Sequence, residues 1–262
     1  MFGRFLELGI ATPDIAASVQ FYERLGFTQL LTGDAWPHRY GVLSDGRISL
    51  GLHERAMPSP SLCFVLPDLA RARTRLALTH IEPELAHLDE ERLHELRLRD
   101  PAGQAITLLE ARTFSPAPPG STAESLCGYF SHLSLPQPDF KPARRFWESA
   151  GMVALPPVRQ PYAHVPLTSD ALNLAFHRPS LCESALLVFE CEQLPRQRAR
   201  LAELNIALSQ KSPRAPNRAS VLIEAPEGTL LWLLGPQSCS GISDLAALGD
   251  QAVAHVHALG HA

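Results

Sequence analysis

Apolar and polar residues alternate from Phe5 to Ala11, and this two-residue period predicts a strand with one buried face. Asp14, a residue type suited to capping a helix N-terminus, follows shortly after. Apolar side chains then recur at helical spacing and form one stripe, at Ile15, Val19, Tyr22 and Leu25. Gly26 stands where a glycine commonly ends a helix. The chain is therefore expected to begin with a strand and an amphipathic helix.

Short strand-like runs follow this helix and complete a first unit. They span 27–31, 39–43 and 48–53, and a Ser44-Asp45-Gly46 turn joins the last two as a hairpin. A second unit then begins, with strands at 62–66, 92–99 and 104–109 and a helix from Asp68 to near Leu78. Each half of the chain is thus expected to contain two βαβββ units.

The whole pattern occurs twice, because residues recur at a spacing of 125 positions. This spacing relates Glu7 to His132, Phe21 to Phe146 and Gly26 to Gly151, and it also aligns the turns that begin at Asp100 and Ala225. His53 and His177 each close the fourth strand of a repeat, one position out of step. A repeat of this length is a duplicated domain, since solenoid repeats span only about 20–50 residues.

The local composition of the chain indicates where its domain boundaries lie. A segment rich in proline and serine, which cannot hold a helix or a central strand, separates the halves. We expect a first domain at 1–112, a linker at 113–125 and a second domain at 126–236. An Ala-rich helical tail is expected at 237–262.

Composition and net charge limit the classes of partner that the chain is expected to bind. The 262 residues are 45% hydrophobic and carry a formal charge of −4, which argues against nucleic acid because phosphate-binding surfaces are normally basic. No apolar run is long enough to cross a membrane, and the N-terminus enters a strand without a leader. The odd number of scattered cysteines, five, indicates reduced thiols. We expect a cytoplasmic protein that is a monomer or a homodimer and binds a small molecule.

Several segments together resemble a known superfamily. They are the strand before Asp14 with Phe21-Tyr22 and Leu25-Gly26-Phe27, their copies at Asp139, Phe146-Trp147 and Gly151-Met152, the run Phe64 to Leu69, and the Asp100-Pro101-Ala102-Gly103 turn. This pattern is similar to the vicinal oxygen chelate superfamily, which includes glyoxalase I, bleomycin-resistance proteins, fosfomycin-resistance enzymes and extradiol dioxygenases. The resemblance covers nearly all of 5–235. It implies an α+β fold of two tandem domains, each a cupped mixed sheet with helices outside.

The resemblance also implies three inward positions in each domain where a divalent metal is usually held. In the first domain these positions are occupied by Glu7, Ser61 and Thr107, and in the second by His132, Leu186 and Trp232. Neither set holds more than one strong ligand, and exchanging half-domains between the sets does not change this. We therefore expect no resident metal, with Fe, Mn, Zn or Ni as the alternative.

Glu7 and His132 remain as polar groups at equivalent inward positions on otherwise apolar strands. A buried carboxylate or imidazole can serve as a catalytic acid or base or as an anchor for a ligand. The alternative is that both are relics of a metal-binding ancestor. His53 and His177, at strand ends, are expected to be capping or surface residues.

Other side chains near the cups are candidate ligand-binding groups. Aromatic and imidazole side chains on or beside the third strands could stack on a flat ligand. Arg97 and Arg99 precede the Asp100 turn, and one of them could point inward to an anionic group. The full set is Tyr40, Ser61, Arg97, Thr107, Tyr162, His164 and Trp232.

Three functions fit these observations. The first is a metal-free small-molecule binder, like the drug-sequestering members of the superfamily. The second is a lyase, isomerase or ring-cleaving dioxygenase that uses Glu7 or His132, with or without a metal. The third is a structural protein whose pockets are vestigial.

Overall fold

The computed structural model describes residues 2–32, 36–78, 81–88, 94–111, 125–170, 172–210, 213, 215 and 218–237. Of the predicted linker at 113–125, only Ser125 is among them. The predicted helix in the tail beyond Gln237 lies outside the described residues. The predicted domain boundaries fall at these two places and stay predictions.

The first repeat builds one eight-stranded sheet and two helices. Its elements are β1 (Arg4–Ala11), α1 (Ile15–Arg24), β2 (Thr28–Leu30), β3 (Tyr40–Ser44), β4 (Ser49–His53), β5 (Ser61–Leu66), α2 (Leu69–Leu78), β6 (Leu85–His87), β7 (Glu95–Arg99) and β8 (Ala105–Glu110). The sequence pattern had marked a single strand over 92–99, whereas the structure has two strands, β6 and β7, between α2 and β8.

The second repeat builds a second sheet in the same way. Its elements are β9 (Tyr129–Pro136), α3 (Phe140–Ser149), β10 (Val153–Ala154), β11 (Val165–Thr168), β12 (Asn173–His177), β13 (Leu186–Glu190), α4 (Leu194–Glu203), β14 (Leu208–Ser209), β15 (Arg218–Glu224) and β16 (Leu230–Gln237). The predicted α+β class, with two tandem sheets of mixed strand direction, is confirmed.

Strand order is the same in both sheets. In the first it is β2-β3-β4-β1-β5-β8-β7-β6, and in the second β10-β11-β12-β9-β13-β16-β15-β14. The opening strand of each repeat lies near the centre, parallel to the fourth strand and antiparallel to the fifth. Residues of β1 therefore lie between the two units of the domain.

Local signals fix the helix ends as expected. The Asp14 carboxylate accepts a 3.0 Å hydrogen bond from the Ala17 N–H at the start of α1, and Asp139 accepts one of 2.9 Å from Lys141 in α3. Gly26 and Gly151 follow these helices with φ of 91° and 106°, a conformation that glycine adopts without a steric penalty.

Alternation along the strands separates two faces of each sheet. Leu8, Ile10, Leu50 and Leu52 belong to the main core, where they pack with helix residues such as Tyr22. The intervening residues point to the opposite face. We call this opposite face the first cup in the first sheet and the second cup in the second sheet.

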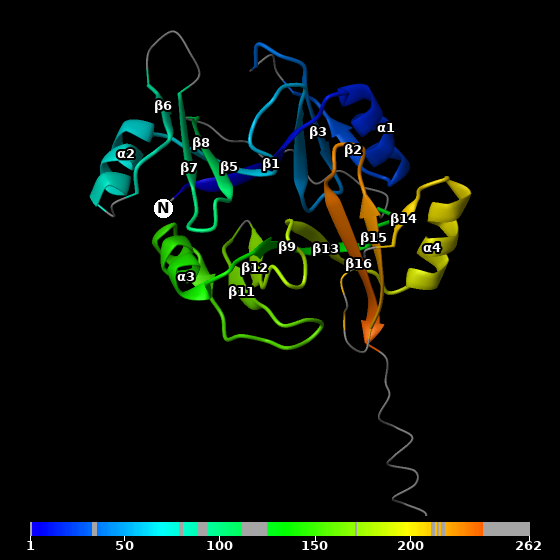
Figure 1. Cartoon of the computed structure of the whole chain (residues 1–262). Coiled ribbons are helices and arrows are strands. Elements are labelled where there is room, and N and C mark those ends of the chain that lie inside the picture. Colours follow the sequence, from blue (N-terminus) through cyan, green and yellow to red (C-terminus); the bar gives the residue numbers. More distant parts are fainter. Residues whose placement is uncertain are drawn as a thin grey trace, which may run out of the picture.

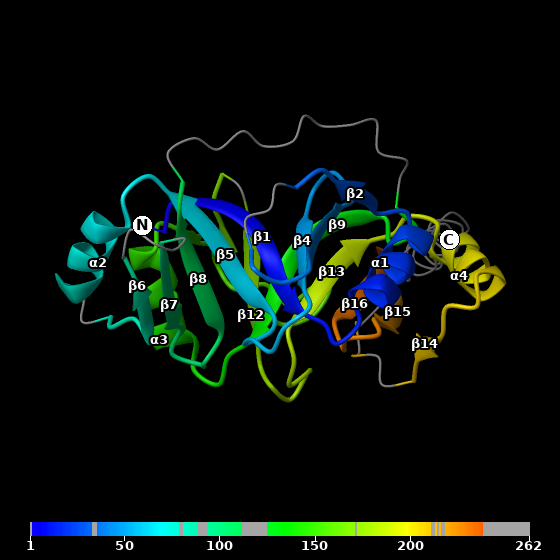
Figure 2. The same cartoon turned by 90° about the horizontal axis from the view of Figure 1, so that it is seen from above.

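The two repeats pack so that helices pair at both ends of the molecule. In Figures 1 and 2, α2 lies beside α3 at one end and α1 beside α4 at the other. The N–H of Phe2 donates to Ala150 O at the end of α3, and that of Leu126 donates to Leu25 O at the end of α1.

The repeats also exchange buried polar contacts at equivalent places. Asp100, in the turn between β7 and β8, accepts hydrogen bonds from Trp147 Nε1 at 3.2 Å and Gln137 Nε2 at 2.6 Å. In the corresponding turn of the second repeat, Glu227 accepts from the Tyr22 hydroxyl at 2.7 Å and from Ser18 Oγ at 2.8 Å. These contacts relate the halves by an approximate twofold axis.

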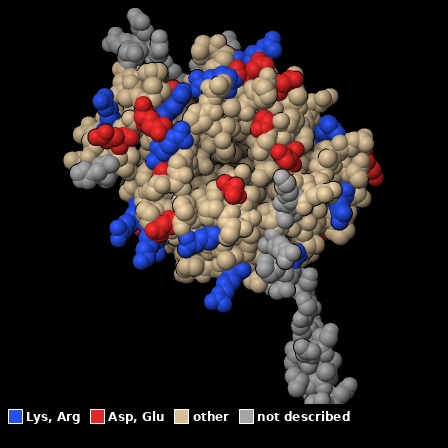
Figure 3. All heavy atoms as spheres, viewed as in Figure 1, with Lys and Arg blue, Asp and Glu red and all other residues tan. Residues whose placement is uncertain are grey.

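Acidic and basic side chains are interspersed on the face shown in Figure 3, which is hollowed near its centre. None of the helices in the described part of the chain is long and apolar enough to cross a membrane.

Candidate functional site

Polar side chains form a row across the first cup. The strand register places Arg97 beside Thr107, Thr107 beside Cys63, and Cys63 beside Glu7. These residues alternate with core leucines, so their side chains share the face opposite α1 and α2. Two βαβββ units therefore contribute to one continuous polar floor.

Glu7 is the central group of this floor and is only 2% exposed. The Tyr40 hydroxyl donates a 2.6 Å hydrogen bond to Glu7 Oε2. The other carboxylate oxygen, Oε1, lies 3.5 Å from His53 Nε2. Gly51 makes room for the carboxylate, because a Cβ at that position would stand 2.2 Å from Glu7 Oε1.

Two histidines and a tryptophan extend from this carboxylate. His53 Nδ1 and His38 Nε2 are 2.9 Å apart, which is a hydrogen bond between the imidazoles. Trp36 packs its ring 5.3 Å from that of His53 and 5.6 Å from that of His38. Burial, and then the charge of Arg55, lower the pKa of His38 below its ordinary value. If His38 Nε2 is assigned as the donor in this hydrogen bond, a neutral His53 carries its own proton on Nε2.

The network around Glu7 is open. His53 Nε2 is enclosed but has no hydrogen-bond partner among the described residues, and its 3.5 Å separation from Glu7 exceeds hydrogen-bond length. A buried donor without an acceptor costs free energy. A hydroxyl group placed here could accept from His53 and donate to Glu7 at once.

Ser61 and Thr107 stand elsewhere on the same floor. Both are buried, and their hydroxyls are hydrogen-bonded to each other at 2.9 Å. The neighbouring Cys63 thiol has its pKa raised by burial and by the charge of Glu7, so it stays protonated.

Charged residues occupy the far side of the cup. Arg97 Nε donates a 2.6 Å hydrogen bond to Glu95 Oε1, and this pair is largely buried. Arg55, which follows β4, holds its guanidinium 5.3 Å above the Trp36 ring. Its pKa is lowered by burial and then by the charge of Arg97, whereas Glu95 acts in the opposite direction.

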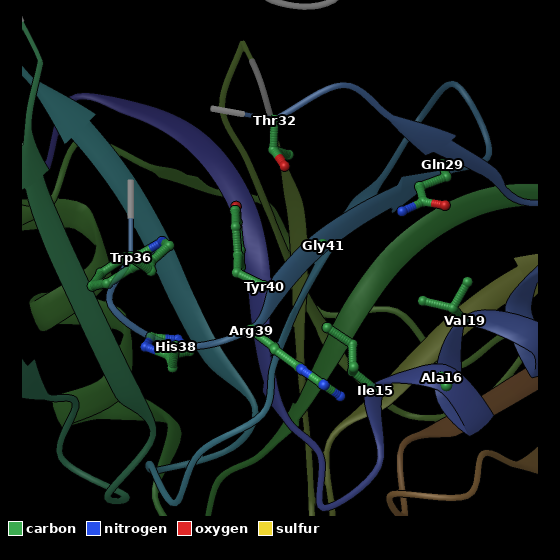
Figure 4. Close-up of a pocket in the computed structure, with 10 residues that line it drawn as sticks. All are labelled: Ile15, Ala16, Val19, Gln29, Thr32, Trp36, His38, Arg39, Tyr40 and Gly41. Carbon is green, nitrogen blue, oxygen red and sulfur yellow. The ribbon is translucent and has the colours of Figure 1, made fainter. Parts of the chain in front are cut away.

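A cavity of about 420 Å³ opens at the edge of this sheet, between α1 and the β2–β3 strands. Trp36, His38 and Tyr40 line it together with Arg39 and Ile15. Figure 4 shows Arg39 extending toward α1, while Trp36 and His38 lie on the other side of the chain. Tyr40, which is hydrogen-bonded to Glu7, and His38, which is hydrogen-bonded to His53, thus both line this cavity.

The second cup contains a closed network around His132. Its Nε2 is 2.6 Å from the Tyr162 hydroxyl, and Tyr162 in turn donates to Ser134 Oγ at 2.9 Å. Ser134 Oγ lies 2.7 Å from His177 Nδ1, and His177 Nε2 donates to the Cys182 carbonyl at 2.9 Å. Every group in this chain has a partner on each side.

Burial keeps these histidines neutral. It lowers the pKa of His132 to about 3, with further contributions from the charges of His164 and His177. Burial is also the main cause that lowers the pKa of His164 and His177 below the ordinary histidine value. A group with a pKa of about 3 is a weak base at neutral pH, so His132 is less suited to proton transfer than the sequence suggested.

Bulky side chains fill the rest of the second cup. Trp232, 0% exposed, packs its ring 5.1 Å from that of Tyr162, which is 1% exposed. Leu186, Val188 and Leu222 complete this cluster. His164 stacks on His132 with ring centroids 5.4 Å apart. The predicted ligand-binding residues of the second domain thus contact one another; their role toward a ligand stays a prediction.

The positions where the resemblance implies a metal do not fit one. In the first cup Ser61 and Thr107 offer only neutral hydroxyls that already bond to each other. In the second cup Leu186 has no donor atom, and the indole of Trp232 has only an N–H. Within the described ranges, no three His, Cys, Asp or Glu side chains are grouped so that they could hold a metal ion.

Sequence reasoning did not identify the roles of three residues of the site, His53, His177 and Arg55. His53 and His177 were expected at the surface, yet they are 2% and 0% exposed. Strand alternation could have predicted that His53 is buried, because it places His53 on the same sheet face as Gly51 and Glu7. Arg55 gave no usable signal, since it lies beyond the end of β4.

The two sheets and their strand order define a tandem vicinal oxygen chelate fold, as the resemblance implied. No protein-family model matches the sequence, and no curated protein matches it significantly. The fold is nevertheless shared with solved structures of ring-cleaving dioxygenases.

Three of these structures illustrate the likeness. A catechol 2,3-dioxygenase is 16% identical with a TM-score of 0.56, over 89% of this chain and 88% of that chain. The 2,3-dioxygenase LapB from Pseudomonas sp. KL28 is 13% identical with a TM-score of 0.59, over 90% and 94%. Homoprotocatechuate 2,3-dioxygenase from Arthrobacter globiformis is 14% identical with a TM-score of 0.60, over 89% and 80%. At such identities the likeness defines the fold alone.

Proposed function

We propose that the chain binds a small organic molecule in the first cup, without a resident divalent metal. The observation that carries this proposal is the separation of 3.5 Å, without a hydrogen bond, between the buried Glu7 carboxylate and the buried Nε2 of His53. A ligand hydroxyl would satisfy both groups. The His132 network of the second cup is already closed, although Trp232 Nε1 there has no partner among the described residues, and we therefore place the ligand in the first cup.

The donor set supports a site without a metal. A hard or borderline cation needs several oxygen or nitrogen ligands, and Glu7 is the only strong one among the three family positions of the first cup. A ring-cleaving dioxygenase reaction that depends on a metal is therefore disfavoured. The likeness to dioxygenases is consistent with an organic ligand of small size.

A second candidate is an enzyme that moves protons, such as a lyase or isomerase. The chain Glu7–His53–His38 favours it, because it runs from the floor of the cup to a residue on the cavity wall. Glu7 would take a proton from the ligand and return it to a different atom. His53 would hold the ligand oxygen during this exchange.

Ligand screening by thermal shift tests the proposal, with wild type, Glu7→Gln and His132→Gln compared. We expect ligands that raise the melting temperature of wild type and His132→Gln, and do so much less for Glu7→Gln. Stabilisation that survives Glu7→Gln and disappears in His132→Gln would move the site to the second cup. The same ligands, followed by NMR for chemical change, separate a binder from an isomerase or lyase.

Elemental analysis of tag-free protein tests the absence of a metal. The protein is measured as purified and after incubation with Fe²⁺, Mn²⁺, Zn²⁺ and Ni²⁺ followed by desalting. We expect no near-stoichiometric retention. Stoichiometric metal that is lost in Glu7→Ala would contradict the proposal and make a metal-dependent enzyme the better reading.

A further inference from the structure

The Arg55 guanidinium makes no direct ion pair with the residues that the structure describes, although the charge of Glu95 acts on it. Its side chain also makes no hydrogen bond with any residue that the structure describes, and its Nε is enclosed, whereas its backbone N–H donates to His53 O. Arg55 is only partly buried, and it is the enclosed N–H at Nε that is unfavourable without a partner. Such a group is stable when an anion completes its surroundings.

Arg97 brings a second guanidinium to the same side of the cup. Its Nε is used by Glu95, which leaves the terminal N–H groups for another acceptor. Arg97 shares the cup face with Thr107, and its positive charge acts on Arg55. Two guanidinium groups and one carboxylate, Glu95, leave an excess of one positive charge.

The opposite end of the polar row has different chemistry. Glu7 and Arg97 are separated by three strand spacings, through Cys63 and Thr107, which is about 14 Å between backbones. Their side chains extend into the cup from the two ends of this row. Trp36, beneath Arg55, adds a flat apolar wall.

We propose that the ligand of the first cup is a small organic carboxylate with a hydroxyl group at its other end. Arg55 and Arg97 bind the carboxylate, and the hydroxyl stands beside His53 Nε2 and Glu7 Oε1, within hydrogen-bond distance of both atoms. Guanidinium groups suit this task because they offer paired N–H donors that match the two oxygens of a carboxylate. This inference rests on the proposed function, because it places the ligand in the same cup.

Three matched probes test it by isothermal titration calorimetry: 4-hydroxybenzoate, its neutral methyl ester and benzoate. We expect 4-hydroxybenzoate to bind, and the methyl ester to bind about tenfold or more weakly, because a hydrogen-bonded charge pair is lost. Benzoate is also expected to bind more weakly, because it lacks the hydroxyl. An ester that binds as well as the acid would overturn the proposal without any variant.

Substitutions then locate the anion. Arg55→Gln and Arg97→Gln are each expected to weaken 4-hydroxybenzoate about tenfold and to leave the ester unchanged. Arg144→Gln, at an exposed arginine of α3, serves as the matched control. Unchanged binding of the acid in both cup variants would overturn the proposal.

Failure of this inference can be told from failure of the proposed function. If the ester binds, the acid does not, and Glu7→Gln abolishes ester binding, the cup is a binding site but not for a carboxylate. If none of the three probes binds wild type, the carboxylate proposal is overturned, and the broad screen with Glu7→Gln decides the function separately.

Discussion

The Tyr40 hydroxyl and the Glu7 carboxylate are joined by a hydrogen bond of 2.6 Å on the floor of the first cup. The same distance separates Tyr162 from His132 in the second repeat. The two tyrosines do not occupy equivalent positions, since strand pairing aligns Tyr40 with His53 and places His164, rather than Tyr162, closest to His177 in register. The polar group on the opening strand, Glu7 in one repeat and His132 in the other, is thus hydrogen-bonded to a tyrosine at a non-equivalent position.

Removing the Tyr40 hydroxyl tests how firmly Glu7 is held. Tyr40→Phe deletes a hydrogen bond to a buried carboxylate, so we expect a loss of about 1.5–3 kcal/mol in the free energy of unfolding. Urea denaturation measures it. Tyr129→Phe, at a tyrosine that is 53% exposed, is the control. An equal effect of the two substitutions would show that the Tyr40 hydrogen bond contributes little.

Gly51 is expected to be intolerant of a side chain. In Gly51→Ala the new Cβ would meet the Glu7 carboxylate at 2.2–2.6 Å, which requires Glu7 to leave its place beside Tyr40. We expect a destabilisation of about 1–3 kcal/mol and loss of ligand binding in the first cup.

A second glycine of the same sheet provides the control for this substitution. At Gly41 a Cβ would have its nearest neighbours at 3.8 and 3.9 Å, which is ordinary contact. Gly41→Ala is therefore expected to be close to neutral. Comparable losses of stability at Gly41 and Gly51 in calorimetric scans would contradict the packing described for Glu7.

The second domain is expected to lose stability in mild acid. His132 has a pKa of about 3 in the folded chain and about 6.5 when unfolded, so the unfolded state binds more protons between these values. Stability therefore falls as pH decreases from about 6.5 toward 3, by up to about 1.4 kcal/mol per pH unit for each such histidine. His164 and His177 shift in the same direction.

Melting temperatures recorded from pH 7.5 to 4.5 check this. His132→Gln should flatten the dependence, whereas His87→Gln, at a partly exposed position of β6, should leave it as in wild type. A stability that is constant across this range would disprove the neutral state assigned to the cluster.

The carboxylates between the repeats are expected to stabilise the packing of the two domains. Asp100→Ala leaves the Trp147 and Gln137 donors buried and unpaired, and each unpaired group costs about 1–3 kcal/mol. Glu227→Ala removes the acceptor of the Tyr22 hydroxyl, whereas Ser18 Oγ keeps Thr12 Oγ1 as a partner at 2.9 Å. Urea denaturation followed by tryptophan fluorescence measures both, with Glu224→Ala at an exposed site of β15 as control. Equal midpoints for all three variants would refute this role.

Most of the fold follows from the sequence because it repeats. Each apolar alternation or helical stripe is seen twice, so Asp14 and Asp139 confirm each other as helix caps, and both do cap helices. The short strand β6 was not separated from β7, because Leu85-Ala86-His87 has too few residues to show a period.

The site was less accessible to sequence reasoning. Glu7 could be chosen as an inward polar group on an apolar strand, but its partners come from other strands. Placing Arg97 in one row with Glu7 requires the register of four strands. The position of Arg55 depends on a chain segment that leaves the sheet, and alternation carries no information there.

The turn contacts between the repeats have a consequence for how the chain assembles. Asp100 fits an indole and an amide, whereas Glu227 fits a phenol and a serine, although the two turns are equivalent by sequence. A pairing of two identical repeats would set Trp147 against Ala225 and leave its N–H without the aspartate that now accepts it. The two halves are therefore complementary to each other and are not interchangeable. Within one chain, each half thus supplies the carboxylate that accepts from the aromatic side chain on the other half's helix.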